Sequence, residues 1–118
     1  MPEYNITPVP APRMTKRDKR LPHRPCVQRY FDFRDAVKKA GITIPSNGSA
    51  VIFYLPMASS WSKKDKAKFN MTPHQQTPDV DNLAKALLDS VFKNDSHIWD
   101  IRISKRWAYE GKIVIIEE

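Results

Sequence analysis

The sequence predicts a single α+β domain, residues 1–118, in which a mixed β-sheet packs against two helices. Three observations point to this fold class. The chain of 118 residues is long enough for one modest hydrophobic core but not for two. Apolar residues recur with helical spacing in two segments, whereas apolar runs or strict alternation mark four others as strands. No internal repeat or change of composition divides the chain.

The first half of the chain is expected to contain a strand, a helix and a second strand. The first strand lies near residues 3–7 and is stopped by the prolines that follow it. A helix is expected near residues 27–40, because its aromatic and apolar residues recur at helical spacing up to a stop at Gly41. The run AVIFYLP then predicts a strand near residues 49–56 that is buried on both faces.

The second half is expected to contain a helix near residues 81–91 and strands near 97–109 and 112–117. The apolar face of this helix consists of Leu83, Ala84, Leu87, Leu88 and Val91. The strand that follows alternates as a half-buried strand does. Its apolar face carries Trp99, Ile101, Ile103, Trp107 and Tyr109. The last strand, KIVII, follows a turn and is apolar throughout.

The composition restricts the class of partner. Lys and Arg number 20 against 13 Asp and Glu, a formal net charge of +7 that favours polyanions, nucleic acid before anionic membrane. No apolar run approaches the length of a membrane span. Cys26 is the only cysteine, which excludes an internal disulfide and a multi-cysteine zinc site, and the three histidines are scattered. Because no secretory signal is visible at the amino terminus, we expect a cytoplasmic protein.

Two basic segments are candidates for contact with DNA. Residues 13–24 lack an apolar period, so this segment is either a solvated arm or one that binds phosphates. Residues 59–77 are expected to form a long loop in which two aromatic residues alternate with lysines. These aromatic side chains either stack on unpaired bases or pack back onto the core. The candidate DNA-binding residues are Arg13, Lys16, Arg17, Arg20, Trp61, Lys63, Lys64, Lys66 and Phe69.

Acidic residues of this basic chain gather in the segment TPDVDNLAKALLDSVFKNDS, residues 77–96. The proline before Asp79 favours extended chain, so Asp79 and Asp81 straddle the start of the helix and project from the same side. Asp95 lies in the turn that precedes the next strand. If the helix and this strand start at the same end of the sheet, the three carboxylates come together.

Two interpretations of these acids compete. Clustered carboxylates repel one another unless a cation neutralises them, and oxygen ligands suit Mg²⁺ or Mn²⁺, which can activate water and stabilise charge on a phosphate. In that case Lys85, one turn beyond Asp81, offsets negative charge or contacts the scissile phosphate. Alternatively, the acids cap the helix and complement its dipole, and Asp81 and Lys85 form an ordinary surface pair.

The segments PDVDNLAKALLD and FKNDS resemble the signature of the RusA family of Holliday junction resolvases, often carried by phages and prophages. YLPMASSWSKKDKAK resembles the lysine-rich loop of that family, and PVPAPRMTK resembles its opening. The resemblance implies metal-binding acids at Asp79, Asp81 and Asp95 and a catalytic lysine at Lys85. Many members carry two adjacent acids where this chain has Asn94 before Asp95, so one possible ligand is absent.

The resemblance implies a Mg²⁺-dependent homodimer that binds four-way DNA junctions and nicks two opposed strands. Such a crossover junction endodeoxyribonuclease acts in recombination and repair, in a bacterial or phage-infected cell. Trp99, Trp107 and Tyr109 are candidates for the dimer interface if they lie outside the core. Two other classes stay open: a DNA-binding module whose acids are structural, and a metal-dependent nuclease that cleaves flaps or duplex.

Overall fold

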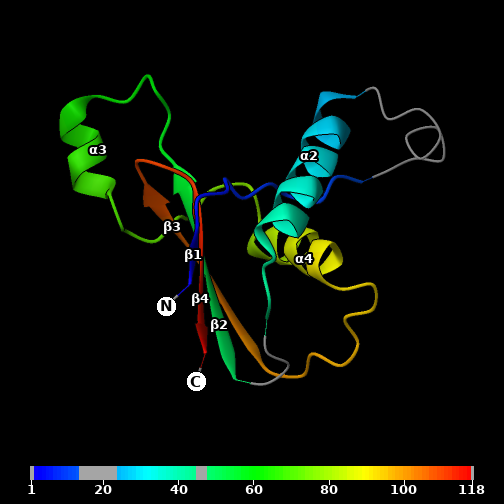
Figure 1. The fold of residues 1–118 in the computed structure, drawn as a ribbon. Helices are drawn as coiled ribbons and strands as arrows, with labels where there is room; N and C mark the ends of the chain where they lie inside the picture. The colour runs from blue at the N-terminus through cyan, green and yellow to red at the C-terminus, as the bar shows by residue number, and fades with distance from the viewer. Residues whose placement is uncertain (1, 14–23, 45–47, 118) are drawn as a thin grey trace.

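The computed structural model describes residues 2–13, 24–44 and 48–117, which form three helices and a four-stranded mixed sheet (Figure 1). The elements in chain order are β1 (Glu3–Tyr4), α2 (Pro25–Ala40), β2 (Ser49–Pro56), α3 (Lys63–Phe69), α4 (Val80–Val91), β3 (Ile101–Ala108) and β4 (Lys112–Glu117). The predicted α+β class is confirmed. None of the helices in the described part of the chain is long and apolar enough to cross a membrane.

The sheet has the strand order β1-β4-β2-β3, with β2 as a central strand. In the middle of β2, Phe53 lies opposite Ile113 of antiparallel β4 and opposite Lys105 of parallel β3. Two parallel strands need a long crossover connection, and the chain between β2 and β3, with α3 and α4, provides it. Val51 and Phe53 are fully buried on one face of β2, whereas on the other face Tyr54 is buried and Ile52 half-buried, so the predicted burial on both faces is met only in part.

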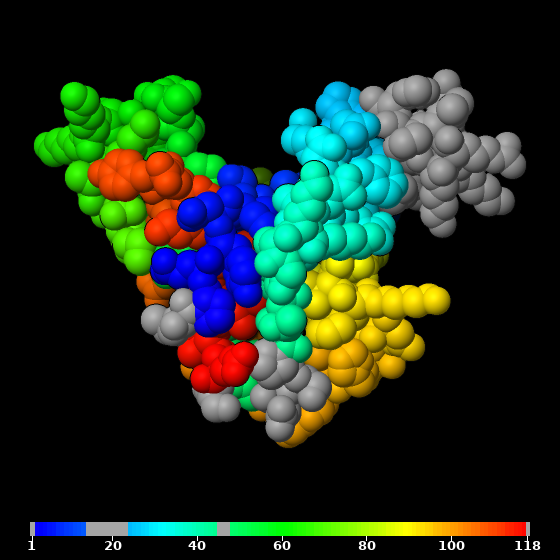
Figure 2. Space-filling view, viewed as in Figure 1, coloured from blue at the N-terminus to red at the C-terminus, as the bar shows by residue number. Residues whose placement is uncertain are grey.

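Helices α2 and α4 pack on each other and cover one face of the sheet, whereas α3 lies apart from them (Figure 1). The main core between sheet and helices comprises Tyr30, Phe33, Val37, Ile42, Ile44, Val51, Phe53, Leu55, Leu83, Ala86, Leu87, Ile113 and Ile115. A smaller cluster on the other face of the sheet contains Tyr54, Ala108 and Val114. Figure 2 shows the molecule hollowed between α3 and α2, with the amino-terminal segment at the bottom of the notch.

The ends of α2 follow from its sequence. Pro25 occupies the start of the helix, where its missing N–H removes no intrahelical hydrogen bond. Gly41 ends the helix in the left-handed conformation, with φ 66°, which glycine adopts without the steric cost that a Cβ would add. The predicted stop at Gly41 is confirmed.

Two strands are shorter than predicted. β1 has only two residues, because the backbone N–H of Ile6 donates to the carbonyl of Tyr4 (2.8 Å) and turns the chain away from the sheet. β3 begins later than predicted, at Ile101, because the N–H of Ile98 donates to the carbonyl of Asp95 (3.0 Å) and closes a turn. Local turns at the two ends therefore override the apolar alternation.

The predicted loop over residues 59–77 contains a helix, α3, so this expectation is wrong in part. No residue of α3 is buried, and the apolar periodicity that reveals a helix is therefore missing. The helix begins after Ser62, whose hydroxyl accepts a hydrogen bond from the N–H of Asp65 (3.1 Å). Serine followed three residues later by an acid is a capping signal that the sequence does contain.

Candidate active site and nucleic-acid interface

Asp79 and Asp81 stand at the start of α4, as the sequence predicts. Asp79 is the N-cap residue, with extended backbone (φ −70°, ψ 148°), and Asp81 lies in the first turn. An N-cap aspartate ordinarily accepts a hydrogen bond from a backbone N–H of the first turn. Here the side chain of Asp79 makes no capping hydrogen bond within the described residues, and both carboxylates are exposed. Hydrogen-bonded capping therefore does not account for Asp79.

The two carboxylates line one side of an open depression of about 700 Å³. Gln76 and Lys105 line it as well. The ammonium group of Lys105 donates hydrogen bonds to the backbone carbonyls of Pro78, at 2.7 Å, and of Gln76. These bonds tie the segment before Asp79 to the middle of β3, so the position of the acid pair is set by the sheet.

Lys105 was not among the site residues predicted from the sequence. It lies on β3 two residues after Ile103 and two before Trp107, which places it on the face predicted to be apolar. A single charge on the apolar face of an alternating strand was the available signal. Burying part of a lysine is favourable only if its ammonium group finds acceptors, and two carbonyls meet that need.

Asp95 does not join the other two acids within one chain. It follows α4, whose 12 residues at about 1.5 Å each separate the helix ends by about 18 Å (Figure 1). Across residues 2–13, 24–44 and 48–117, no group of three acidic, histidine or cysteine residues is placed to hold a metal. The expectation that the three carboxylates meet at one end of the sheet is therefore wrong for a single chain. The reason is that α4 starts beside the middle of β3, at Lys105, whereas Asp95 precedes the beginning of that strand.

Lys85 is exposed on α4, one turn after Asp81. In the part of the chain that the structure describes, it forms no ion pair with Asp81 or Asp89. Among the described residues, the structure therefore lacks the surface ion pair between Asp81 and Lys85 that the alternative interpretation expects. Lys85 does not line the depression either, so a role in catalysis stays a prediction.

Trp61 and Phe69 belong to an aromatic cluster that lies outside the main core. The ring centroid of Trp61 is 4.8 Å from that of Trp107 and 5.6 Å from that of Phe69. Phe69 is 37% exposed and Trp61 is half-buried. The two aromatic residues therefore pack on each other and on β3, while each still offers surface to a ligand.

His74 completes this cluster and was also not predicted as a site residue. Its ring lies on Trp107, with 4.0 Å between the ring centroids, and the residue is only 5% exposed. Burial lowers the pKa of His74 below its ordinary value, and the charge of Lys105 lowers the pKa further. Nδ1 has no hydrogen-bond partner among the described residues. Nothing in the sequence distinguishes this histidine from the exposed His97.

Comparison with known proteins identifies the family. The family model described as "Endodeoxyribonuclease RusA" matches residues 3–117. The chain belongs to the RusA endodeoxyribonuclease family. Over 71 residues the chain is also 32% identical to "Uncharacterized protein YqaN" of Bacillus subtilis (strain 168), a match that covers 53% of this chain and 50% of that protein. The chain thus spans about half the length of this curated relative, and the predicted RusA resemblance is confirmed.

The basic residues predicted to contact DNA lie in two parts of this RusA-family chain. On α3, Lys63 and Lys64 are exposed and Lys66 is half-buried, and Figure 2 shows α3 at one side of the notch. Arg13 is exposed, and its carbonyl accepts a hydrogen bond from the guanidinium group of Arg24 (2.9 Å). The other three, Lys16, Arg17 and Arg20, lie outside the described residues.

The three aromatic residues suggested for a dimer interface differ in exposure. Trp99 is 74% exposed and Tyr109 is 55% exposed. Both lie outside β3 itself, contrary to the prediction. Trp107 is engaged with Trp61 and His74. In the RusA-family chain, Trp99 and Tyr109 therefore remain available for an interface, and Trp107 does not.

Proposed function

We propose that this chain is a Mg²⁺-dependent endodeoxyribonuclease that resolves four-way DNA junctions by nicking two opposed strands. The observation that carries the proposal is the exposed pair Asp79 and Asp81 in an open depression, where Asp79 makes no capping hydrogen bond with any residue that the structure describes. Membership of the RusA family supports nuclease chemistry. The formal net charge of +7 supports a polyanionic substrate.

The acid pair fits the needs of a magnesium ion. Mg²⁺ is usually held by one or two carboxylates, while waters and substrate phosphates complete its octahedral shell. Asp79 and Asp81 supply two exposed oxygen ligands beside an open volume that has room for a phosphate. When bound there, Mg²⁺, or Mn²⁺ in its place, would activate water and stabilise the charge that develops on the phosphate.

Two lysines serve this site in different ways. Lys105 positions the acid pair, because its hydrogen bonds hold the backbone immediately before Asp79. Lys85 projects from the helix one turn beyond Asp81 and has no acidic partner in the described residues. Its ammonium group is therefore available to contact the scissile phosphate or to balance the charge of the substrate.

The proposed working unit is a two-fold homodimer. The acid pair lies at the start of α4, whereas Asp95 follows the end of this helix, which is about 18 Å long. In the dimer, Asp95 of the partner subunit supplies the third carboxylate to each site. The exposed indole of Trp99, four residues after Asp95, supports an apolar contact at this position. A closed two-fold dimer also matches the approximate symmetry of a four-way junction and presents two sites at once.

The proposal is tested by comparing three substrates: a synthetic four-way junction, a flap and a linear duplex, each with Mg²⁺ and with chelator. We expect symmetric nicks in the junction with Mg²⁺, little cleavage of the flap and duplex, and none with chelator. Comparable cleavage of flap or duplex would assign a general metal-dependent nuclease. Junction binding that is indifferent to Mg²⁺ and gives no nicks would assign a DNA-binding module with structural acids.

A further inference from the structure

A second cavity, of about 420 Å³, adjoins the acid depression. Gln76 and Thr77 line both, so the two spaces meet along this short segment. The lining of the second cavity is largely aromatic and apolar: Trp61 and Trp107 contribute indole rings, and the amino-terminal segment and the end of β2 contribute prolines. Its volume lies within the range of about 300–1,000 Å³ that is typical of small-molecule sites.

One buried polar atom in the lining of this cavity lacks a hydrogen-bond partner within the described residues. His74 lines the cavity and is 5% exposed, yet its Nδ1 has no hydrogen-bond partner in the described part of the chain. A buried polar atom without a partner costs free energy, which a ligand recovers when it supplies the missing bond. Burial and the charge of Lys105 lower the pKa of His74, while backbone hydrogen bonding at His74 and Gln76 acts in the opposite direction; the net lowering favours a neutral ring with one N–H.

We propose that this cavity binds a single nucleobase, unstacked from the DNA beside the scissile phosphate, with one face on the wall that Trp61 and Trp107 form together and its polar edge on Nδ1 of His74. This inference rests on the proposed function, because the DNA held at Asp79 and Asp81 supplies the base. A flat ring with apolar faces and a hydrogen-bonding edge matches indole walls with one buried polar atom. Bases at the centre of a junction unstack at low cost, since they are at the end of a helical stack.

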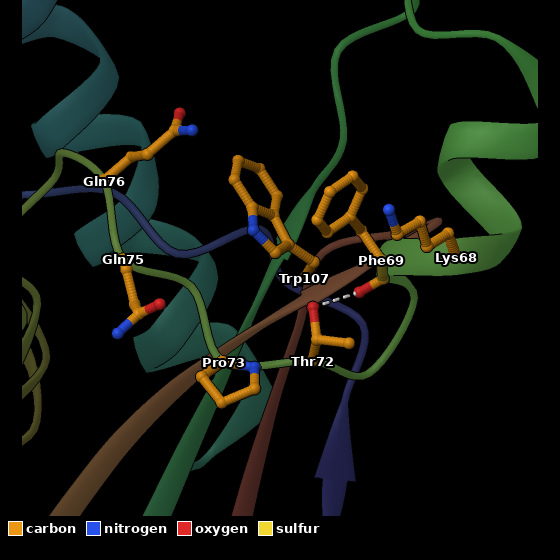
Figure 3. A pocket seen from close by; sticks show the side chains of 7 residues that line it. All are labelled: Lys68, Phe69, Thr72, Pro73, Gln75, Gln76 and Trp107. Carbon is orange, nitrogen blue, oxygen red and sulfur yellow. Dashed lines mark hydrogen bonds between the residues drawn. The ribbon is translucent and has the colours of Figure 1, made fainter.

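The surroundings of Trp107 agree with an extruded nucleotide. Figure 3 shows the indole of Trp107 with the ring of Phe69 on one side and the amide of Gln76 on the other. The hollow beside Phe69 is about 370 Å³ and has Lys68 in its lining. Because Trp107 lines both this hollow and the base cavity, a base held against Trp107 has the ammonium group of Lys68 in the adjoining hollow for a neighbouring phosphate.

The test is an abasic scan of a four-way junction. Each nucleotide around the crossover is replaced in turn by an abasic site, and the Kd for the wild-type protein is measured without divalent metal, so that nothing is cleaved. We expect the Kd to rise by about 5- to 150-fold at one position in each symmetry-related pair, the loss of one aromatic–base contact. A Kd that is uniform across all positions would overturn the inference.

A protein variant shows whether that base occupies the cavity. In Trp61→Ala, the abasic penalty at the sensitive position should shrink toward onefold, because the protein partner of the base is already gone. Phe31→Ala is the matched control, since Phe31 is a half-buried aromatic residue of α2 that does not line the cavity. It should keep the full penalty. An unchanged penalty in Trp61→Ala would place the base elsewhere.

His74 is tested through base identity. The wild type should prefer some bases over others at the sensitive position, whereas His74→Leu should bind all four within about twofold and His74→Asn should retain a preference. A preference that survives in a folded His74→Leu would contradict the role of Nδ1. If His74→Leu does not fold, the abasic scan with Trp61→Ala still decides the inference.

Failure of this inference is separable from failure of the proposed function. All of its readouts are binding constants measured without metal, whereas the proposed function is read as Mg²⁺-dependent nicking. Junction cleavage together with a uniform abasic scan would overturn the base pocket alone. A protein that nicks no DNA would overturn the proposed nuclease, whatever the scan shows.

Discussion

The two ends of α4 carry the same kind of residue in different surroundings. At its start, Asp79 and Asp81 line an open depression, and Lys105 ties the preceding backbone to the sheet. Beyond its end, Asp95 lies in the segment before β3, close in sequence to the exposed Trp99. The first end is an open depression lined by two acids, whereas the second is an exposed segment that the proposed partner subunit would cover.

The difference teaches that proximity in sequence is a poor guide to proximity in space when a helix intervenes. A window of twenty residues that is mostly helical places its ends far apart, at about 1.5 Å per residue. The three acids predicted to bind metal therefore divide into a pair and a remote third. The four predictions below test that division, starting with the largest expected effect.

Asp81→Asn should reduce cleavage of a four-way junction by orders of magnitude, because an amide keeps the shape of the carboxylate but not its charge. Junction binding should persist or tighten, since a negative charge that faces phosphate is removed. The measurement is the single-turnover cleavage rate with Mg²⁺ beside the Kd in chelator. Asp89→Asn, on the same helix but outside the depression, is the control and should cleave normally. Near-normal cleavage by Asp81→Asn would end the metal-site interpretation.

Mixed dimers test whether the remote acid serves the partner. Asp95→Asn alone should be inactive, as Asp81→Asn is. When the two variants are mixed and allowed to exchange subunits, each heterodimer should regain one intact site, because its good acid pair and its good Asp95 come from different chains. The readout is nicking of a cruciform plasmid, which should yield single nicks and little linear product. If the mixture stays inactive while wild type treated in the same way cleaves, Asp95 acts within its own chain.

Two lysine variants separate chemistry from positioning at the start of α4. Lys85→Ala should cleave poorly yet keep its free energy of unfolding, because Ala is the better helix former and Lys85 forms no ion pair with the described acids of its helix. Lys105→Met should lose both cleavage and stability, by about 1.5–3 kcal/mol, since it removes charged hydrogen bonds to two carbonyls. Urea unfolding and cleavage rates measured on the same samples test this. Equal stability losses in both variants would contradict the division of roles.

The smallest expected effect is on the affinity for DNA. We expect neither end of α4 to contribute most of this affinity. Lys63→Gln and Lys64→Gln on α3 should each lower the slope of log K against log salt by about one, the loss of one phosphate contact. The cleavage rate at saturating protein should not change. Lys39→Gln, at the end of α2, serves as the control for a general loss of charge. An unchanged slope in the α3 variants would remove that helix from the DNA interface.

The fold class and most elements could be predicted from the sequence, because apolar spacing reports directly on burial. α4 and β2 begin within one residue of the predicted positions, since each apolar pattern has a sharp boundary. α3 could not be found in this way, because it buries nothing and is marked only by the cap at Ser62.

The site was only partly predictable. The acid motif identified Asp79 and Asp81, but no local pattern reports how far a crossover carries Asp95 from them. Lys105 and His74 owe their roles to contacts with residues distant in sequence, such as the carbonyl of Pro78 for Lys105. Such contacts appear only once the sheet register is known.

The segment over residues 71–74 has a consequence for solubility. It runs along the open edge of β3: the N–H groups of Met71 and His74 donate to the carbonyls of Trp107 and Lys105, and Thr72 accepts from Trp107. An open strand edge is a template on which other chains add as further strands and begin to aggregate. By occupying this stretch with its own backbone, the protein keeps the edge of β3 from serving as a seed. Substitutions that loosen residues 71–74 should therefore reveal themselves first as turbidity in concentrated samples, before any loss of fold is measurable.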